Sequence, residues 1–141
     1  MSVKTLSLLA LLLTACAHPP LQPLPADLAR VTLDSGSRAD MRAYRLDGNL
    51  VRQLRFPDIS PGRHELQVRY QFEVPGGTGR SDRLSEPRRR TCILGLQWEF
   101  VAGKHYRVTA YRLGWNPLGW LENDTGGRLV RARVIRCGPG V

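Results

Sequence analysis

The sequence has few of the residues on which most metal and catalytic sites depend. Its 141 residues include only three histidines and three cysteines. No H-E-x-x-H or C-x-x-C motif occurs, and no His/Cys pair has ligand spacing. Residues 122–127, ENDTGG, offer oxygen ligands without the spacing of a calcium loop. We therefore expect no metal and no cofactor, with a zinc site assembled from His18, His64 or His105 on distant segments as the alternative.

The motifs of covalent catalysis are also missing. No G-x-S-x-G nucleophile elbow is present, and the serines of the domain lie among turn residues: Ser35, Ser37, Ser60, Ser81 and Ser85. Cysteine catalysis would require Cys92 or Cys137 as a free thiol beside a base. Carboxylates that only the fold brings together leave no trace in the sequence. We expect a protein without catalytic activity, and a hydrolase with a hidden site is the alternative.

The sequence has no apolar run long enough to cross a membrane. The run from Leu6 to Leu13 is far shorter than the roughly 20 residues that a spanning helix needs. It follows a short basic start with Lys4 and ends in the small residues before Cys16. This order of basic, apolar and small residues is typical of a secretory signal peptide.

The end of that segment, Leu13-Thr14-Ala15-Cys16, resembles the lipobox of bacterial lipoproteins. The resemblance implies cleavage after residue 15, a diacylglycerol on the Cys16 sulfur and acylation of the new N-terminus. Two or more acyl chains anchor a protein stably, whereas one chain, at about 0.8 kcal/mol per buried CH₂, does not. Because Ala17 follows and not aspartate, analogy with Gram-negative sorting implies the outer membrane, on the periplasmic side. The alternative is an ordinary secreted protein with a cysteine at its cleavage point.

Three segments follow from this assignment: a signal peptide (1–15), a lipidated proline-rich tether (16–28) and one domain (29–141). Residues 17–28 contain four prolines and no periodic pattern. Proline-rich spacers extend by about 3.1 Å per residue, so this one would reach on the order of 35 Å. The tether would hold the domain away from the membrane.

The charge of the chain is strongly positive and comes almost entirely from arginine. The net charge is +9, and only Lys4 and Lys104 among the 21 basic residues are lysines. Arginine recognises phosphate and carboxylate groups bidentately, which suits lipopolysaccharide, anionic lipids or peptidoglycan. A GC-rich genome is the alternative explanation. Export argues against nucleic acid as the partner.

Cysteine usage supports an exported domain. Apart from Cys16 only Cys92 and Cys137 remain, so a single disulfide pairing exists. A bond between them would close a loop of about 45 residues and would stabilise the fold by roughly 4 kcal/mol. Two buried free thiols are the alternative.

Hydrophobic patterning from residue 30 onward predicts strands, and no segment of the domain has a helical period. In 63–74 Leu66, Val68, Tyr70 and Phe72 alternate with polar residues, and 91–100 alternates in the same way. Asp47-Gly48 and 57–62 predict turns. We expect a mainly β fold, a single antiparallel β-sandwich of about six to eight strands.

The remaining segments complete this prediction. Residues 30–34 are a short strand, 75–90 a long polar loop, and 101–104 a turn into a hairpin with 105–113. Residues 114–127 are a second long connection. Residues 128–137 are a final strand with Val130, Ala132 and Val134 inward and a register shift near its end.

Residues 44–70, YRLDGNLVRQLRFPDISPGRHELQVRY, are similar to the PEGA-like and transthyretin-like modules of envelope proteins. The shared features are a short strand, a D-G turn and a PG-R-H-x-L-x-V strand entry. The resemblance lacks the glycine-tyrosine ending of the motif. It implies a non-catalytic β-sandwich.

Two predicted loops are candidate binding sites. The first holds two indoles within 114–127, Trp115 and Trp120, and exposed loop aromatics often mark a contact with glycan or protein. The second holds five arginines within 75–90: Arg80, Arg83, Arg88, Arg89 and Arg90. A positive loop suits an anionic surface. The alternatives are indoles that cap the core and a loop that is merely solvated.

The function we expect is non-catalytic binding by a lipid-anchored envelope protein. The first hypothesis is contact with another envelope protein, through a strand edge or the tryptophan loop. The second is a module that binds anionic peptidoglycan or lipopolysaccharide through the arginine-rich loop. The third is the envelope hydrolase mentioned above.

Overall fold

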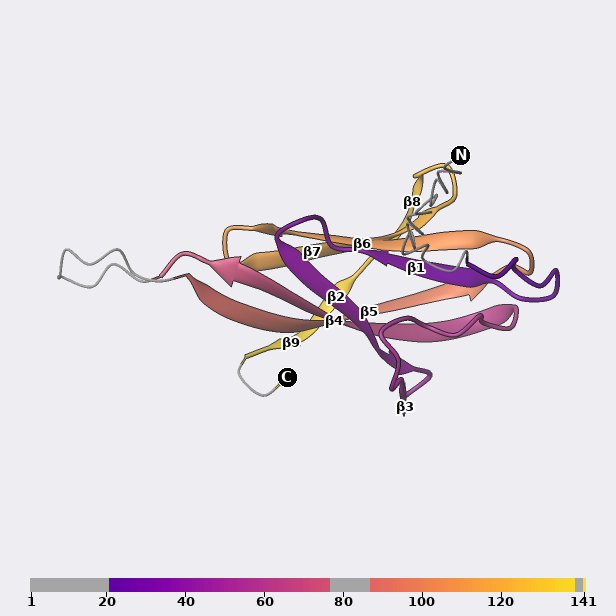
Figure 1. Cartoon of the computed structure of the whole chain (residues 1–141), viewed down its shortest axis with the longest axis horizontal. Helices are drawn as coiled ribbons and strands as arrows, with labels where there is room; N and C mark the ends of the chain where they lie inside the picture. Colours follow the sequence, from indigo (N-terminus) through magenta and orange to yellow (C-terminus); the bar gives the residue numbers. More distant parts are fainter. Residues whose placement is uncertain (1–20, 77–86, 139–140) are drawn as a thin grey trace, which may run out of the picture.

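The chain forms two β-sheets that pack face to face. This computed structural model describes residues 21–76, 87–138 and 141, so the predicted signal peptide and Cys16 lie outside the described residues. The described residues form nine strands and no helix (Figure 1). The prediction of a β-sandwich is confirmed. Within the described ranges, no helix is long and apolar enough to cross a membrane.

The first sheet has four strands in the order β1-β6-β7-β8. Their bounds are β1 (Arg30–Asp34), β6 (His105–Leu113), β7 (Asn116–Asn123) and β8 (Arg128–Arg131). β1 pairs with β6 in parallel and the other pairs are antiparallel, so the sandwich is not purely antiparallel as expected. A parallel pair needs a long crossover between its strands. Here that crossover contains four of the five strands of the opposite sheet.

The second sheet has five antiparallel strands in the order β3-β2-β4-β5-β9. Their bounds are β2 (Ala39–Leu46), β3 (Asn49–Leu50), β4 (Gly62–Val74), β5 (Arg88–Phe100) and β9 (Arg133–Cys137). The predicted turn at Asp47-Gly48 joins β2 to β3. Both turn residues have positive φ, 48° and 80°, which is the requirement of the tightest hairpin turn.

The core lies between the sheets and follows the alternation seen in the sequence. Leu66, Val68, Tyr70 and Phe72 of β4 are at most 2% exposed, as predicted. Cys92, Leu94, Leu96 and Phe100 of β5 are buried in the same phase. The residues between them therefore point to the outer side of the five-stranded sheet, which becomes important below.

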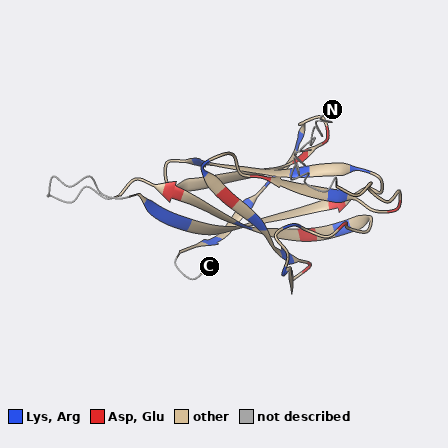
Figure 2. Ribbon diagram, in the orientation of Figure 1, with Lys and Arg blue, Asp and Glu red and all other residues tan. Residues whose placement is uncertain are grey.

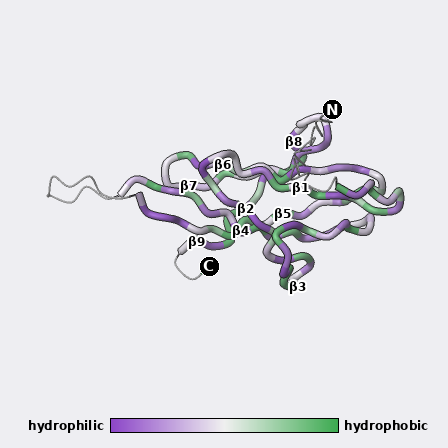
Figure 3. The backbone as a smooth tube through the Cα atoms, in the orientation of Figure 1, coloured by the Kyte–Doolittle hydropathy of each residue, from purple (hydrophilic) through white to green (hydrophobic). Residues whose placement is uncertain are grey.

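The predicted loop at 75–90 is wrong at its C-terminal end. β5 begins at Arg88, and Val74 pairs with Arg88, Glu73 with Arg89 and Phe72 with Arg90. Opposite charges directly across a pair of strands favour this extension, as at Glu73 and Arg89. The hydrophilic start of β5 stands out in Figure 3. Arg80 and Arg83 lie outside the described residues.

Two predicted connections are also wrong. Residues 116–123 form β7 and not a loop, with Pro117, Gly119 and Leu121 on its buried side. Proline and glycine are poor strand formers, and here they occupy the inward positions that normally identify a strand. The predicted hairpin after 101–104 does not form, because β5 and β6 belong to different sheets. The actual hairpin joins β6 to β7.

The predicted single strand at 128–137 is two strands in different layers. β8 belongs to the four-stranded sheet and β9 to the five-stranded sheet, with the buried Ala132 between them (Figure 1). The predicted register shift is present in the pairing of β9 with β5. Val134 is 48% exposed and not inward as predicted. This change of layer explains why the apolar phase switches within the segment.

Both ends of the domain are fastened. A Cys92–Cys137 disulfide joins β5 to β9, so the predicted pairing is confirmed. At the other end, the Gly103 amide donates to the Leu28 carbonyl over 2.8 Å, and Arg30 Nη1 donates to the Gln22 carbonyl. Residues 22–28 of the predicted tether therefore lie against the domain, beside the four-stranded sheet.

Candidate functional site

The outer side of the five-stranded sheet gathers arginines from four of its strands. Their directions follow from the buried alternation of β4 and β5 and from the pairing register. We call this surface the arginine face: Arg42, Arg45, Arg69, Arg89, Arg133 and Arg136. In Figure 2 basic segments mark β2, the start of β5 and β9. Residues far apart in the sequence thus form one basic surface.

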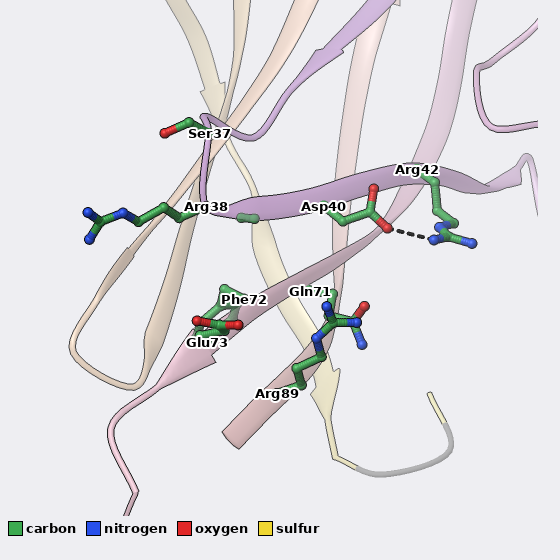
Figure 4. Close-up of a pocket in the computed structure, with 9 residues that line it drawn as sticks. Ser37, Arg38, Asp40, Arg42, Gln71, Phe72, Glu73 and Arg89 are labelled. Atoms are coloured by element: carbon green, nitrogen blue, oxygen red, sulfur yellow. Dashed lines mark hydrogen bonds and ion pairs between the residues drawn. The ribbon is translucent and has the colours of Figure 1, made fainter. Parts of the chain in front are cut away.

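One end of the arginine face is hollowed. A hollow of about 610 Å³ is lined by residues of β2, β4 and β5 and the turn before β2. Figure 4 shows Asp40 and Arg42 paired at its rim, with Arg89 and Gln71 directed into it. Glu73 also lines it, so the hollow carries both signs of charge. Its two acidic side chains, Asp40 and Glu73, make it a poor site for a purely anionic group.

The centre of the face is more one-sided in charge. A register shift between Ala43 and Arg45 is typical of a β-bulge, and it turns both Tyr44 and Arg45 outward. The guanidinium carbon of Arg45 lies 5.3 Å from the centre of the Tyr44 ring, and that of Arg69 lies 5.6 Å from it. Both distances are in the cation–π range. Two arginines from different strands therefore converge on one tyrosine.

A second hollow lies beside Tyr44, and we call it the Tyr44 hollow. Its volume is about 320 Å³, and it is lined by Tyr44, Arg45, Gly48, Gln67, Ile93, Ile135 and Arg136. The Arg45 guanidinium lowers the pKa of the Tyr44 hydroxyl below its ordinary value of 10.0, partial burial opposes this, and Arg136 adds to the lowering. The phenol oxygen is therefore in a positive potential.

The arginines around Tyr44 differ from their neighbours in having no acid. Arg42 pairs with Asp40 at 2.6 Å, and Arg133 pairs with Glu65 at 3.4 Å. Arg45, Arg69 and Arg136 form no ion pair within the described ranges, and neither does Arg89 at the end of the face. The buried Nε of Arg69 has no hydrogen-bond partner there either. Arg69 also stands directly opposite Arg42, and like charges in that position are destabilising.

The residues predicted as binding sites are separated by the fold. Arg89 points to the arginine face, whereas Arg90 is on the inward phase of β5 and lies 5.9 Å from the ring centre of Trp115. Trp115 is 47% exposed in the turn between β6 and β7. Among the described residues of the two predicted sites, this is the pair that the fold brings together across strands.

Trp120 is not in a loop with Trp115 as predicted. It lies in β7 on the outer side of the four-stranded sheet, opposite Thr109 and Arg131. Arg128 covers its ring at 4.6 Å and Arg131 at 5.7 Å. A ring already covered by two guanidinium groups is less available for a ligand. The alternative that both indoles cap the core is wrong for Trp120.

Asp47, His64 and Ser60 are arranged in the order of a catalytic triad. His64 Nδ1 lies 2.6 Å from Asp47 Oδ2, and Nε2 lies 3.3 Å from Ser60 Oγ. However, Nε2 is closer to the Ser60 carbonyl, at 3.0 Å. A carbonyl only accepts, so Nε2 donates there and has no lone pair for the hydroxyl proton. We interpret the group as a link between the β2–β3 turn and the entry of β4.

Two carboxylates at the edges of the sandwich make its stability dependent on pH. Arg30 donates to both oxygens of Asp58 at 2.8 Å, and these hydrogen bonds lower the pKa of Asp58 below its ordinary 3.8 despite partial burial. For Asp47, burial acts to raise the pKa, but the hydrogen bonds from His64 and the Glu65 amide outweigh it.

A depressed carboxyl pKa stabilises the fold above the unfolded value, and that stabilisation is lost as pH falls through the folded value. We expect the free energy of unfolding to fall as pH drops from neutral to below 3.8. In Asp58→Asn the slope should be shallower, because one such group is gone. Denaturant unfolding at a series of pH values measures this. Equal slopes for the two proteins would contradict the role of Asp58.

Comparison with protein-family models, curated proteins and solved structures finds no match to this chain. In the part of the chain that the structure describes, no group of three or more His, Cys, Asp or Glu side chains is placed to hold a metal ion. The site must therefore be interpreted from its own geometry.

Sequence reasoning missed Tyr44, Arg45, Arg69, Arg133 and Arg136. A partial signal existed for Arg69, which lies on the polar phase of 63–74. Arg136 and Tyr44 gave none, because a register irregularity decides the direction of each.

Proposed function

We propose that this chain is a lipid-anchored outer-membrane protein whose β-sandwich faces the periplasm and binds an anionic envelope component without catalysis. The observation that carries the binding proposal is the group of three arginines around Tyr44 that lack a carboxylate among the described residues. Guanidinium groups satisfy their donors best against phosphate or carboxylate. The arginine face thus replaces the predicted arginine-rich loop as the binding surface.

Lipid attachment is tested by metabolic labelling with a clickable fatty acid in cells that produce the full chain. We expect the wild-type chain to be labelled and Cys16→Ser to be unlabelled. The Cys92→Ala/Cys137→Ala double variant is the matched control, because it removes cysteines but keeps Cys16. Labelling of Cys16→Ser at the wild-type level would exclude the anchor.

Anion binding is tested by pull-down of the full chain with peptidoglycan sacculi and with lipopolysaccharide over a salt series. We expect binding to weaken as salt screens the charges and to be lost in Arg69→Glu/Arg136→Glu. Arg107→Glu/Arg112→Glu on β6 makes the same change of net charge away from the arginine face. If both double variants bind alike, or if salt has no effect, the arginine face is not the binding surface.

A protein partner in the envelope is the second candidate. The observation that favours it is the apolar exposure near both edges of the same sheet. Val134 and Ile135 of β9 are 48% and 41% exposed, and Leu50 and Leu54 at and after β3 are 60% and 66% exposed. An edge strand can take up a partner strand. Crosslinking in the native envelope from positions in β9, followed by identification of the partner, tests this candidate.

A further inference from the structure

We propose that the Tyr44 hollow binds a phosphate group of the ligand through Arg45 and Arg136, the two arginines that line it. This inference rests on the proposed function and names the chemical group that the arginine face recognises. The two arginines come from β2 and β9, so the site exists only when these strands are assembled in one sheet.

The geometry places these arginines around one side chain. Arg45 and Arg69 lie over the Tyr44 ring, and Arg136 lines the hollow beside that ring together with Arg45. Gln67 adds an amide to the rim, while Ile93 and Ile135 contribute an apolar wall. Charge interactions are stronger beside apolar groups than in open water. The site therefore combines donors with partial exclusion of solvent.

The charge of the site favours phosphate over carboxylate. A phosphate monoester carries about −1.5 to −2 charges at neutral pH and three acceptor oxygens, whereas a carboxylate carries one charge and two oxygens. Two guanidinium groups without acids present more charge and more donors than one carboxylate can satisfy.

The ring of Tyr44 has a positioning role in this site. Its ring centre lies 5.3 Å from the guanidinium carbon of Arg45, which lines the hollow, and 5.6 Å from that of Arg69, which does not. Gly95 contributes in another way: a Cβ on Gly95 would lie 2.8 Å from Ile135 Cδ1. A side chain there would displace Ile135, which forms part of the wall of the hollow.

The test compares two sugar anions that differ in the acidic group. The full chain is titrated calorimetrically with glucose 1-phosphate and with glucuronate at the same ionic strength. We expect the phosphate to bind at least about tenfold more tightly, and Arg45→Gln and Arg136→Gln each to weaken it by about tenfold. Arg107→Gln, which has the same charge change on the other sheet, should leave the affinity unchanged. Unfolding curves check that each variant is folded.

The source of the phosphate is assigned by a second pair of probes. Phosphatidylcholine vesicles with and without lipopolysaccharide distinguish a lipid-borne phosphate from a soluble one, and glucose 1-phosphate should compete for either. Equal affinity for glucuronate, or equal weakening by Arg107→Gln, would overturn the phosphate site. If the arginine-face variants lose sacculus binding that glucose 1-phosphate does not compete with, the phosphate inference fails and the proposed function stands.

Discussion

Replacing both bonded cysteines, in Cys92→Ala/Cys137→Ala, is expected to lower the free energy of unfolding by about 2–5 kcal/mol. The bond closes a loop between residues 45 apart in sequence, and it restricts the unfolded chain accordingly. For a domain of this size, the loss corresponds to a fall in Tm of roughly 10–30 °C. Denaturant and thermal unfolding of the full chain, followed by tryptophan fluorescence, measure both quantities.

The effect has a structural reason beyond loop closure. β9 is an edge strand of only five residues that pairs with β5 alone. Four of these residues are arginine or exposed valine and isoleucine. Little apolar burial holds it in place. Cys16→Ser is the control that removes a cysteine without affecting the bond. A reductant should reproduce the loss in the wild-type chain, and an unchanged stability in both cases would show that β9 is held by other contacts.

Leu94→Ala is expected to lower the free energy of unfolding by about 2–5 kcal/mol, because Leu94 is fully buried between the two layers. A Cβ built on Gly119 of β7 would lie 3.1 Å from Leu94 Cδ1 and 3.1 Å from the Cβ of Ala132. Gly119→Ala alone should therefore be slightly destabilising through overpacking. In the double variant, the new methyl group enters the space that Leu94 has vacated.

The two changes should thus be coupled. We expect the double variant to be more stable than the sum of the single effects predicts, by about 0.5–3 kcal/mol. The control cycle combines Gly119→Ala with Phe100→Leu at the far end of β5, where the effects should add. Equivalent additivity in both cycles would show that Leu94 and Gly119 are not in contact across the core.

The sequence predicted the strands whose apolar residues alternate and whose turns have a chemical signature. β4 followed from Leu66, Val68, Tyr70 and Phe72, and the β2–β3 turn followed from Asp47-Gly48. β7 was missed because Pro117 and Gly119 occupy its inward positions. The start of β5 was missed because three consecutive arginines are typical of a solvated loop. Their pairing with β4 depends on the continuous antiparallel pairing of the residues that follow them in β5.

The candidate site was predicted less well than the fold, for a physical reason. Arg45, Arg69 and Arg136 share one surface because β2, β4 and β9 belong to the same sheet. The order of strands in a sheet is decided by contacts between distant segments. The predicted cysteine pairing implied that β5 and β9 are adjacent, but the sequence did not predict the positions of β2 and β4. The bulge at Tyr44 and the irregular register of β9 decide which way these side chains point, and neither leaves a pattern in single-sequence periodicity.

The passage of residues 128–137 from one layer to the other also has a consequence for biogenesis. Under the proposed export, with the N-terminus first, this segment is delivered last, so the strands that have already crossed the inner membrane lack the strand pair that unites the layers. Completion of the domain would then wait for release from the translocation channel and for oxidation at Cys137. Truncation just before residue 128 should consequently yield a protease-sensitive product, even though most of the hydrophobic residues are already present.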